Sequence, residues 1–268
     1  MLRDNLDTLA QDICRSDMQS TEALLERVDF ARASAKSQDR PDPILKMKRG
    51  LVKYMGAAYY LRDAARFHAA VAAYQGTTDE LLASFDVPAA ALLVDLCLAI
   101  IGGPANLRRA TIAAIMRGAR EPETPDALRA AARILAATSD LDPHSAMSDA
   151  WALFGACRRQ ELPDERIGRF LPFAAAAIRV NRGDFTRSGK AVGRALHRVD
   201  RAVEASVQAE LERIRRGGAS AVTASSFVGF PTAALTAIAA SRAARSVQDA
   251  WPTTLFSDFR WMGHSGWA

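Results

Sequence analysis

Apolar side chains recur along most of the chain at steps of three and four residues, which places them on one face of an α-helix. The strict alternation of apolar and polar residues that is typical of a half-buried strand is nearly absent. Pro, Gly and polar residues separate the periodic segments, so we expect short loops between helices. Helices are predicted over Leu2–Cys14, from Thr21, over Ile44–Tyr74, after Thr77, from Pro88, over Leu107–Arg117, from Asp126, from Pro143, over Pro163–Val180, over Asp184–Arg216 and over Phe227–Ser246.

Interruptions inside these segments have recognisable signals. In the long segment from 44 to 74, Gly50 and Gly56 are the expected weak points, because glycine destabilises a helix interior. Thr77 and Glu80 have the spacing of a capping box, which predicts a new helix there. Pro172 removes a backbone donor, so we expect it to kink or interrupt its helix.

Other signals mark where helices begin. Asp86 is suited to cap the helix that has Pro88 in its first turn, and the segments Thr124-Pro125-Asp126 and Asp142-Pro143 each open a further helix. The most apolar stretch, Pro88–Ile101, contains a single charged residue, Asp95, and is too short to span a membrane. It is therefore predicted to be a buried helix.

These elements predict an all-α protein of about ten helices. Short connections favour antiparallel helix pairs, arranged as an irregular multi-helix bundle or a short α-solenoid-like array. No repeat of the tetratricopeptide kind recurs in register. We expect a single all-helical domain over 1–268, with the aromatic tail at 251–268 packed on it.

Composition narrows the class of protein. Hydrophobic residues make up 49% of the chain but aromatic residues only 7%, so the core is expected to consist largely of aliphatic side chains and alanine. Three widely separated cysteines, Cys14, Cys97 and Cys157, fit reduced thiols better than a disulfide framework. The N-terminus has no apolar run of the secretory kind. We therefore expect a soluble, cytoplasmic protein with no membrane partner.

No pattern in the chain predicts a catalytic, cofactor-binding or metal-binding residue. The chain lacks a Gly-Lys-Ser/Thr loop for phosphate, and around Ser265 the serine-hydrolase pattern fails because Trp267 occupies the place of the final glycine. No two histidines have the spacing of metal ligands on a helix. The histidines are His68, His144, His197 and His264.

One cluster leaves an enzyme open as an alternative. Tyr59, Tyr60, Asp63 and His68 lie close together in the predicted helix 44–74, where Tyr60, Asp63 and Phe67 would share a face. Acid–base chemistry is conceivable with these groups. A packed or hydrogen-bonded structural role is the other interpretation of His68.

Cations follow one another along the predicted helix 184–216 at steps of three, four, four and three, which places them on one stripe. This basic ridge could be a solvated face with salt bridges to neighbouring acids, or it could bind an acidic partner. The apolar stripe from Val192 to Ile214 faces elsewhere on the same helix. The basic ridge consists of Arg187, Lys190, Arg194, Arg198 and Arg201.

The C-terminal segment concentrates large aromatic rings, which are costly to leave in water. The aromatic tail could fold back over a groove between helices and complete the core. Alternatively, some of its rings and its arginine could anchor a partner, since Trp and Arg are common in binding hot spots. The residues are Trp251, Phe256, Phe259, Arg260, Trp261 and Trp267.

The order of several segments resembles a known family. The chain has AYYLRDA at 58–64, WALF at 151–154, FPTAAL at 230–235 and FRWM at 259–262. In this order it is similar to the all-helical immunity proteins of bacterial polymorphic-toxin systems, the family numbered forty-nine among them. The resemblance implies a cytoplasmic antidote that binds and blocks a toxin, with no enzymatic activity of its own.

We therefore predict a non-catalytic binding protein, an immunity protein that occludes a cognate toxin with the basic ridge and the aromatic tail. The formal net charge of +5 argues against an inhibitor that mimics nucleic acid and against a strongly basic toxin. Nucleic acid is not the expected partner, because no aromatic residues are interleaved with the ridge arginines. The alternative is a helical scaffold or adaptor with a groove for peptides.

Overall fold

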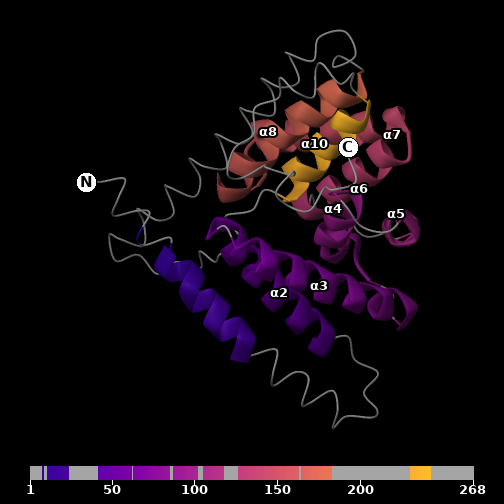
Figure 1. Ribbon diagram of the computed structural model, residues 1–268. Coiled ribbons are helices and arrows are strands. Elements are labelled where there is room, and N and C mark those ends of the chain that lie inside the picture. The colour runs from indigo at the N-terminus through magenta and orange to yellow at the C-terminus, as the bar shows by residue number, and fades with distance from the viewer. Residues whose placement is uncertain are drawn as a thin grey trace. The chain divides into compact units, whose positions relative to one another are not determined.

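The computed structural model describes residues 8, 11–23, 42–61, 63–84, 87–101, 105–117, 126–162, 164–182 and 230–242 (Figure 1). Every regular element within these ranges is a helix, which confirms the predicted all-α fold. The described helices form two compact units, one ending at Ser84 and one starting at Ala89. Whether these two units form the single domain expected from the sequence is not tested by this division, so the single domain stays a prediction. Within these ranges, no helix has both the length and the apolar composition that crossing a membrane requires.

The first unit contains a helix at 11–23, α2 (Asp42–Tyr60) and α3 (Ala64–Ser84), which lie side by side (Figure 1). Helix 11–23 is continuous, although the sequence pattern predicted one helix ending at Cys14 and another starting at Thr21. Along α2 the buried apolar residues recur at steps of three and four, so one stripe of the helix faces the core. These residues are Ile44, Met47, Leu51, Met55 and Ala58.

The break in the long segment falls after Tyr60, and the prediction of weak points at Gly50 and Gly56 is wrong. Both glycines lie buried inside α2. The helix ends because the Asp63 amide donates to the Ala58 carbonyl at 2.9 Å and leaves the regular helical pattern. Burial against neighbouring helices outweighs the intrinsic cost of glycine in a helix interior.

The predicted capping box at Thr77 and Glu80 is also wrong, because α3 continues through both residues. The hydroxyls of Thr77 and Thr78 donate to the Tyr74 carbonyl at 2.7 and 3.1 Å, so they are satisfied within the helix. The buried Lys48 on α2 donates through Nζ to Thr78 Oγ1 at 2.6 Å. Its Nζ also lies 3.8 Å from the centre of the Tyr74 ring, so a charged group ties α2 to α3.

The second unit is built around α6 (Ala127–Ser139), which contacts every other described element of that unit. The predicted buried helix corresponds to the 3₁₀ helix η1 and α4, and almost all of α4 is buried, including Asp95. The surrounding elements are η1 (Ala89–Leu92), α4 (Leu93–Ile101), α5 (Ala105–Arg117), α7 (Pro143–Arg158), α8 (Asp164–Asn181) and α10 (Phe230–Arg242).

Alanine forms much of the contact surface between these helices. A methyl side chain lets two helices approach closely and loses no rotamer freedom on burial. The buried alanines of α6, α7, α8 and α10 include Ala131, Ala132, Ala136, Ala137, Ala146, Ala150, Ala174, Ala177, Ala233, Ala234 and Ala237.

The predicted helix starts at Asp126 and Asp142 are confirmed. The Asp126 carboxylate accepts from the Leu128 amide at 3.0 Å, and that of Asp142 accepts from the Ser145 amide at 3.1 Å. Pro172 lies inside α8, so the expected interruption is wrong, while the alternative of a kink stays a prediction. Pro231 is in the first turn of α10, where a missing amide donor costs little.

The turns that follow α6 and α7 have the same geometry. Leu141 and Gln160 have positive φ angles of 61° and 58°. In each turn the following residue, Asp142 or Glu161, donates its amide five residues back, to Ala137 or Ala156. This is the Schellman arrangement, in which glycine usually occupies the left-handed position. Leu141 is in addition 74% exposed, so its side chain gains little from packing.

The three cysteines are free and buried. Burial raises the pKa of the Cys14 thiol to about 12 and also raises the pKa values of Cys97 and Cys157. The reactive thiolate form is therefore scarce in all three.

We expect Ala136→Leu to destabilise the protein by about 1–3 kcal/mol, because α6 has neighbours on nearly all sides and no room for a larger side chain. Urea unfolding followed by circular dichroism measures the change. Ala152→Leu, at an exposed position of α7, is the matched control and should stay within about 0.5 kcal/mol of the wild type. Equal stability of the two variants would contradict close packing around α6.

Leu141→Gly should stabilise the protein by up to about 1 kcal/mol, since glycine adopts a positive φ without steric cost. The greater freedom of glycine in the unfolded chain offsets part of the gain. The same substitution at the exposed, right-handed Asp140 should destabilise, and a thermal melt of both variants gives the comparison. A loss of stability in Leu141→Gly would show that the leucine side chain matters more than its backbone.

Candidate functional site

The binding residues predicted from the sequence lie outside the described residues, so their role stays a prediction. This applies to the basic ridge, Arg187, Lys190, Arg194, Arg198 and Arg201, and to the aromatic tail with Trp251, Phe259, Arg260, Trp261 and Trp267.

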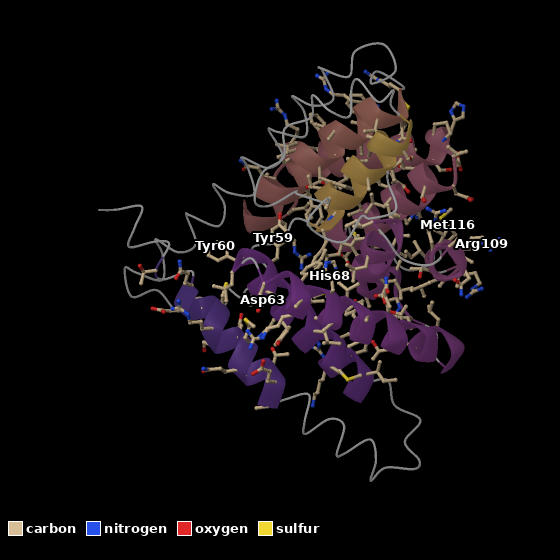
Figure 2. The ribbon with its side chains drawn as sticks, viewed as in Figure 1. Tyr59, Tyr60, Asp63, His68, Arg109 and Met116 are labelled. Carbon is tan, nitrogen blue, oxygen red and sulfur yellow. The ribbon has the colours of Figure 1, made fainter. Side chains whose placement is uncertain are left out.

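The four residues considered for acid–base chemistry come from two helices and the turn between them (Figure 2). Tyr59 is completely buried, and its ring centre lies 6.2 Å from that of Phe67. His68 is exposed and meets the Phe67 ring in an edge-on contact at 5.9 Å. Because the helix breaks after Tyr60, the single face expected for Tyr60, Asp63 and Phe67 does not exist.

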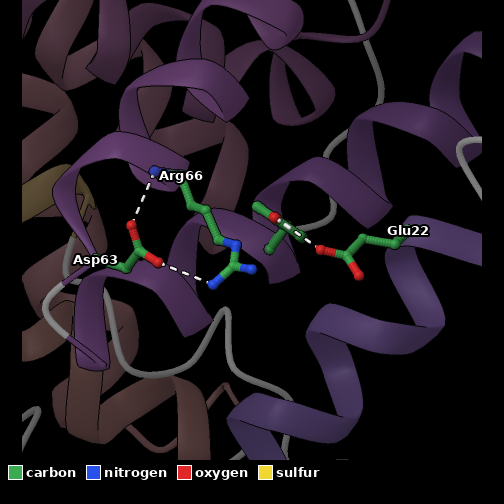
Figure 3. Close-up of polar contacts among 4 residues, drawn as sticks. Glu22, Asp63 and Arg66 are labelled. Carbon is green, nitrogen blue, oxygen red and sulfur yellow. Dashed lines mark hydrogen bonds and ion pairs between the residues drawn. The ribbon is translucent and has the colours of Figure 1, made fainter.

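Asp63 acts as the cap of α3. Its carboxylate accepts from the backbone amide of Arg66 and from the Arg66 guanidinium, both at 3.0 Å (Figure 3). The hydrogen bond from the Arg66 amide is the main cause that lowers the pKa of Asp63, and the guanidinium lowers it further. A lowered pKa suits a helix cap, which needs a charged acceptor, and does not suit a proton donor at neutral pH.

A lowered pKa means that Asp63 stabilises the folded protein above its ordinary value of 3.8 and that this contribution disappears as the pH falls through the lower folded value. Asp63→Asn keeps the cap acceptor but has no proton to gain. We therefore expect the urea midpoint to fall less between pH 7 and pH 3 in Asp63→Asn than in the wild type. Asp140→Asn, at an exposed position, should behave as the wild type. An equal fall in all three proteins would contradict the role of Asp63.

On the second unit, α5 exposes a basic face. Its buried stripe is narrow and consists of Leu107, Thr111 and Ile115. Arg109 and Met116 project from this helix (Figure 2), and Met116 is 41% exposed. We define the α5 face as Arg108, Arg109, Met116 and Arg117, all of them exposed.

The three arginines of the α5 face are exposed. In the part of the chain that the structure describes, the side chains of Arg108, Arg109 and Arg117 have no ion pair or hydrogen bond. The sequence of α5 contains no acidic residue. Arg108 and Arg109 are the fourth and fifth residues of α5, and Arg117 is its last residue, where the helix dipole favours a positive charge. Within the described residues, the α5 face therefore presents positive charge that no acid neutralises.

A second basic surface is a hollow of about 540 Å³ in the first unit, between helix 11–23 and α2. We call it the basic hollow. Among the described residues of its lining, the cations all come from α2. The described lining residues are Ser20, Thr21, Ala23, Lys46, Arg49, Gly50 and Lys53.

The three cations of the basic hollow have no acidic partner among the described residues. Arg49 donates only its Nε, to the Leu45 carbonyl at 3.3 Å, and Lys46 and Lys53 make no side-chain hydrogen bond within the described ranges. The neighbouring acid Glu22 accepts from the Tyr54 hydroxyl at 3.0 Å instead (Figure 3). Burial and this hydrogen bond raise the pKa of Tyr54.

Sequence reasoning missed both surfaces. Lys46, Arg49 and Lys53 have steps of three and four, the same signal that indicates the basic ridge. The hollow also needs helix 11–23 opposite, which no local pattern gives. Among the described residues, no three of His, Cys, Asp or Glu gather in an arrangement that could hold a metal ion.

No protein-family model, curated protein or solved structure was found to match the chain. The resemblance to helical immunity proteins therefore depends on the segments quoted from the sequence and stays a prediction.

Proposed function

We propose that this chain is a non-catalytic binding protein, a cytoplasmic immunity protein that neutralises a cognate bacterial toxin by direct binding and occlusion. The observation that carries the proposal is the α5 face, where Arg108, Arg109 and Arg117 are exposed and have no ion pair or hydrogen bond among the described residues. Exposed positive charge of this kind is suited to bind an acidic partner surface.

The composition of the α5 face supports binding to a protein. Arginine and methionine are enriched at protein interfaces, and lysine and glutamate are depleted there. The positive potential of Arg108, Arg109 and Arg117 would attract an acidic surface and speed up its association. The immunity role itself comes from the sequence resemblance, and the expected toxin surface is acidic.

Growth of a bacterial host tests this proposal. The gene directly upstream of the one that encodes this chain is expressed alone and together with the chain. We expect the upstream product alone to arrest growth and co-expression to restore it. A harmless upstream product, or an arrest that this chain does not relieve, would contradict the immunity role. A protein that binds peptides without such a neighbour would favour the helical adaptor.

Arg108→Glu combined with Arg109→Glu should weaken toxin binding about tenfold or more, since two attractive charges become repulsive. The same change should leave the free energy of unfolding within about 0.5 kcal/mol of the wild type, because both positions are exposed and make no described ion pair. Affinity by calorimetry and a thermal melt measure the two effects.

The matched control is Arg158→Glu with Arg179→Glu, which changes the charge equally at two exposed positions of α7 and α8. Binding should survive there. Arg194→Glu with Arg198→Glu tests the basic ridge in the same assay. Full binding by the α5 variant would exclude the α5 face as the contact surface.

A further inference from the structure

We infer that the basic hollow binds an acidic helical segment of a partner protein, which presents carboxylates at steps of three and four residues. The inference rests on the proposed function only in taking the partner to be a protein. Its physical basis is the row of cations on α2 and the lining of the hollow, which are independent of the α5 face.

The spacing of the cations sets the shape of the occupant. Lys46, Arg49 and Lys53 follow one another at steps of three and four along one helix. Side chains at such steps lie about 5–6 Å apart, and the whole row extends about 10 Å along α2. One phosphate-sized anion would contact all three cations only if their side chains converged on it. A partner helix with acids at the same steps repeats the same distances.

The hydroxyls in the lining argue against a phosphate cradle. Thr21 Oγ1 donates to the Gly50 carbonyl at 3.4 Å, and Ser20 Oγ donates to the Asp17 carbonyl at 3.1 Å. Both hydroxyl protons are therefore committed to backbone oxygens. Of the lining side chains, the donors that remain are the flexible cations, which suit carboxylates on equally flexible side chains.

The arrangement of the hollow allows a helix to approach. Gly50 contributes no side chain to the lining and Ala23 contributes only a methyl group. Neither residue therefore obstructs the space between the cations and helix 11–23. With its Nε bonded to Leu45, Arg49 keeps both Nη groups for a carboxylate, which the guanidinium can bind in a bidentate manner. Laying a helix along a groove between two helices is a common mode of recognition.

Among the described residues, no acid of the first unit forms an ion pair with the row. Glu22 accepts from Tyr54, Asp63 is paired with Arg66, and Asp12 lies 3.1 Å from Arg15. Lys46 and Arg49 are exposed and Lys53 is half-buried, so a partner can reach all three. Charge complementarity therefore selects an acidic occupant.

The probe is an alanine-based helical peptide of about 20 residues, long enough to hold a helix in water, with glutamates at i, i+3 and i+7. A reference peptide has the same composition with its glutamates distributed around the helix. We expect isothermal titration calorimetry with the full chain to show binding of the patterned peptide about fivefold tighter than the reference. Equal binding of the two peptides would overturn the inference, whatever the variants do.

Lys46→Glu with Lys53→Glu should weaken binding of the patterned peptide about tenfold or more. Arg158→Glu with Arg179→Glu, which makes the same change of charge on the other unit, should leave it unchanged. Full binding by the Lys46/Lys53 variant would overturn the inference, provided its far-ultraviolet circular dichroism melt matches that of the wild type. Tripolyphosphate that binds more tightly than the patterned peptide would also overturn it, because that result defines a small-anion site.

The growth assay and the peptide assay fail independently. If the chain gives no protection but still prefers the patterned peptide, the proposed function is contradicted and the hollow remains a site for an acidic helix. If the chain binds both peptides equally, this inference is contradicted and the proposed immunity role rests on the α5 face.

Discussion

The close approach of helices to α6 is the constraint on which the second unit depends. One helix of ordinary length contacts η1, α4, α5, α7, α8 and α10. It buries two large side chains, Ile134 and Leu135, and otherwise meets its neighbours mainly with alanine methyl groups, which allow a close approach. Burying alanine orders no side-chain torsion, so little conformational entropy is lost. The specific arrangement of the helices must then come from the shape of their contacts, because alanine side chains are all alike.

The charged residues divide into those that serve the fold and those that do not. Arg133 links α6 to Asp149 of α7 at 3.0 Å, yet burial raises the pKa of Asp149 in spite of this arginine, so the ion pair does not fully offset the cost of burying the carboxylate. Asp63 with Arg66 ends one helix and starts the next. Within the described ranges, the cations of the basic hollow and of the α5 face have no acidic partner. Their positive charge is therefore what these ranges offer for recognition.

Local signals predicted the all-α fold and the helix starts at Asp126 and Asp142, because a cap needs only its own few residues. They failed where distant contacts decide. At Thr78 a hydrogen bond from Lys48 and burial keep α3 continuous through an apparent capping box. Gly50 is tolerated within α2 because a neighbouring helix covers it. Likewise, the spacing of Lys46, Arg49 and Lys53 is visible in the sequence, but the hollow beside them requires helix 11–23 as its second wall.

The two Schellman turns at Leu141 and Gln160 have a consequence for how the protein folds. They join α6, α7 and α8 with almost no loop, so the contacts among these helices are local in sequence and need little loop closure. We expect this helical triplet to form early. α10, which packs on α4, α6 and α8, begins only at Phe230 and has to find its place after a long chain segment has closed. The triplet is therefore the natural template on which the rest of the second unit assembles.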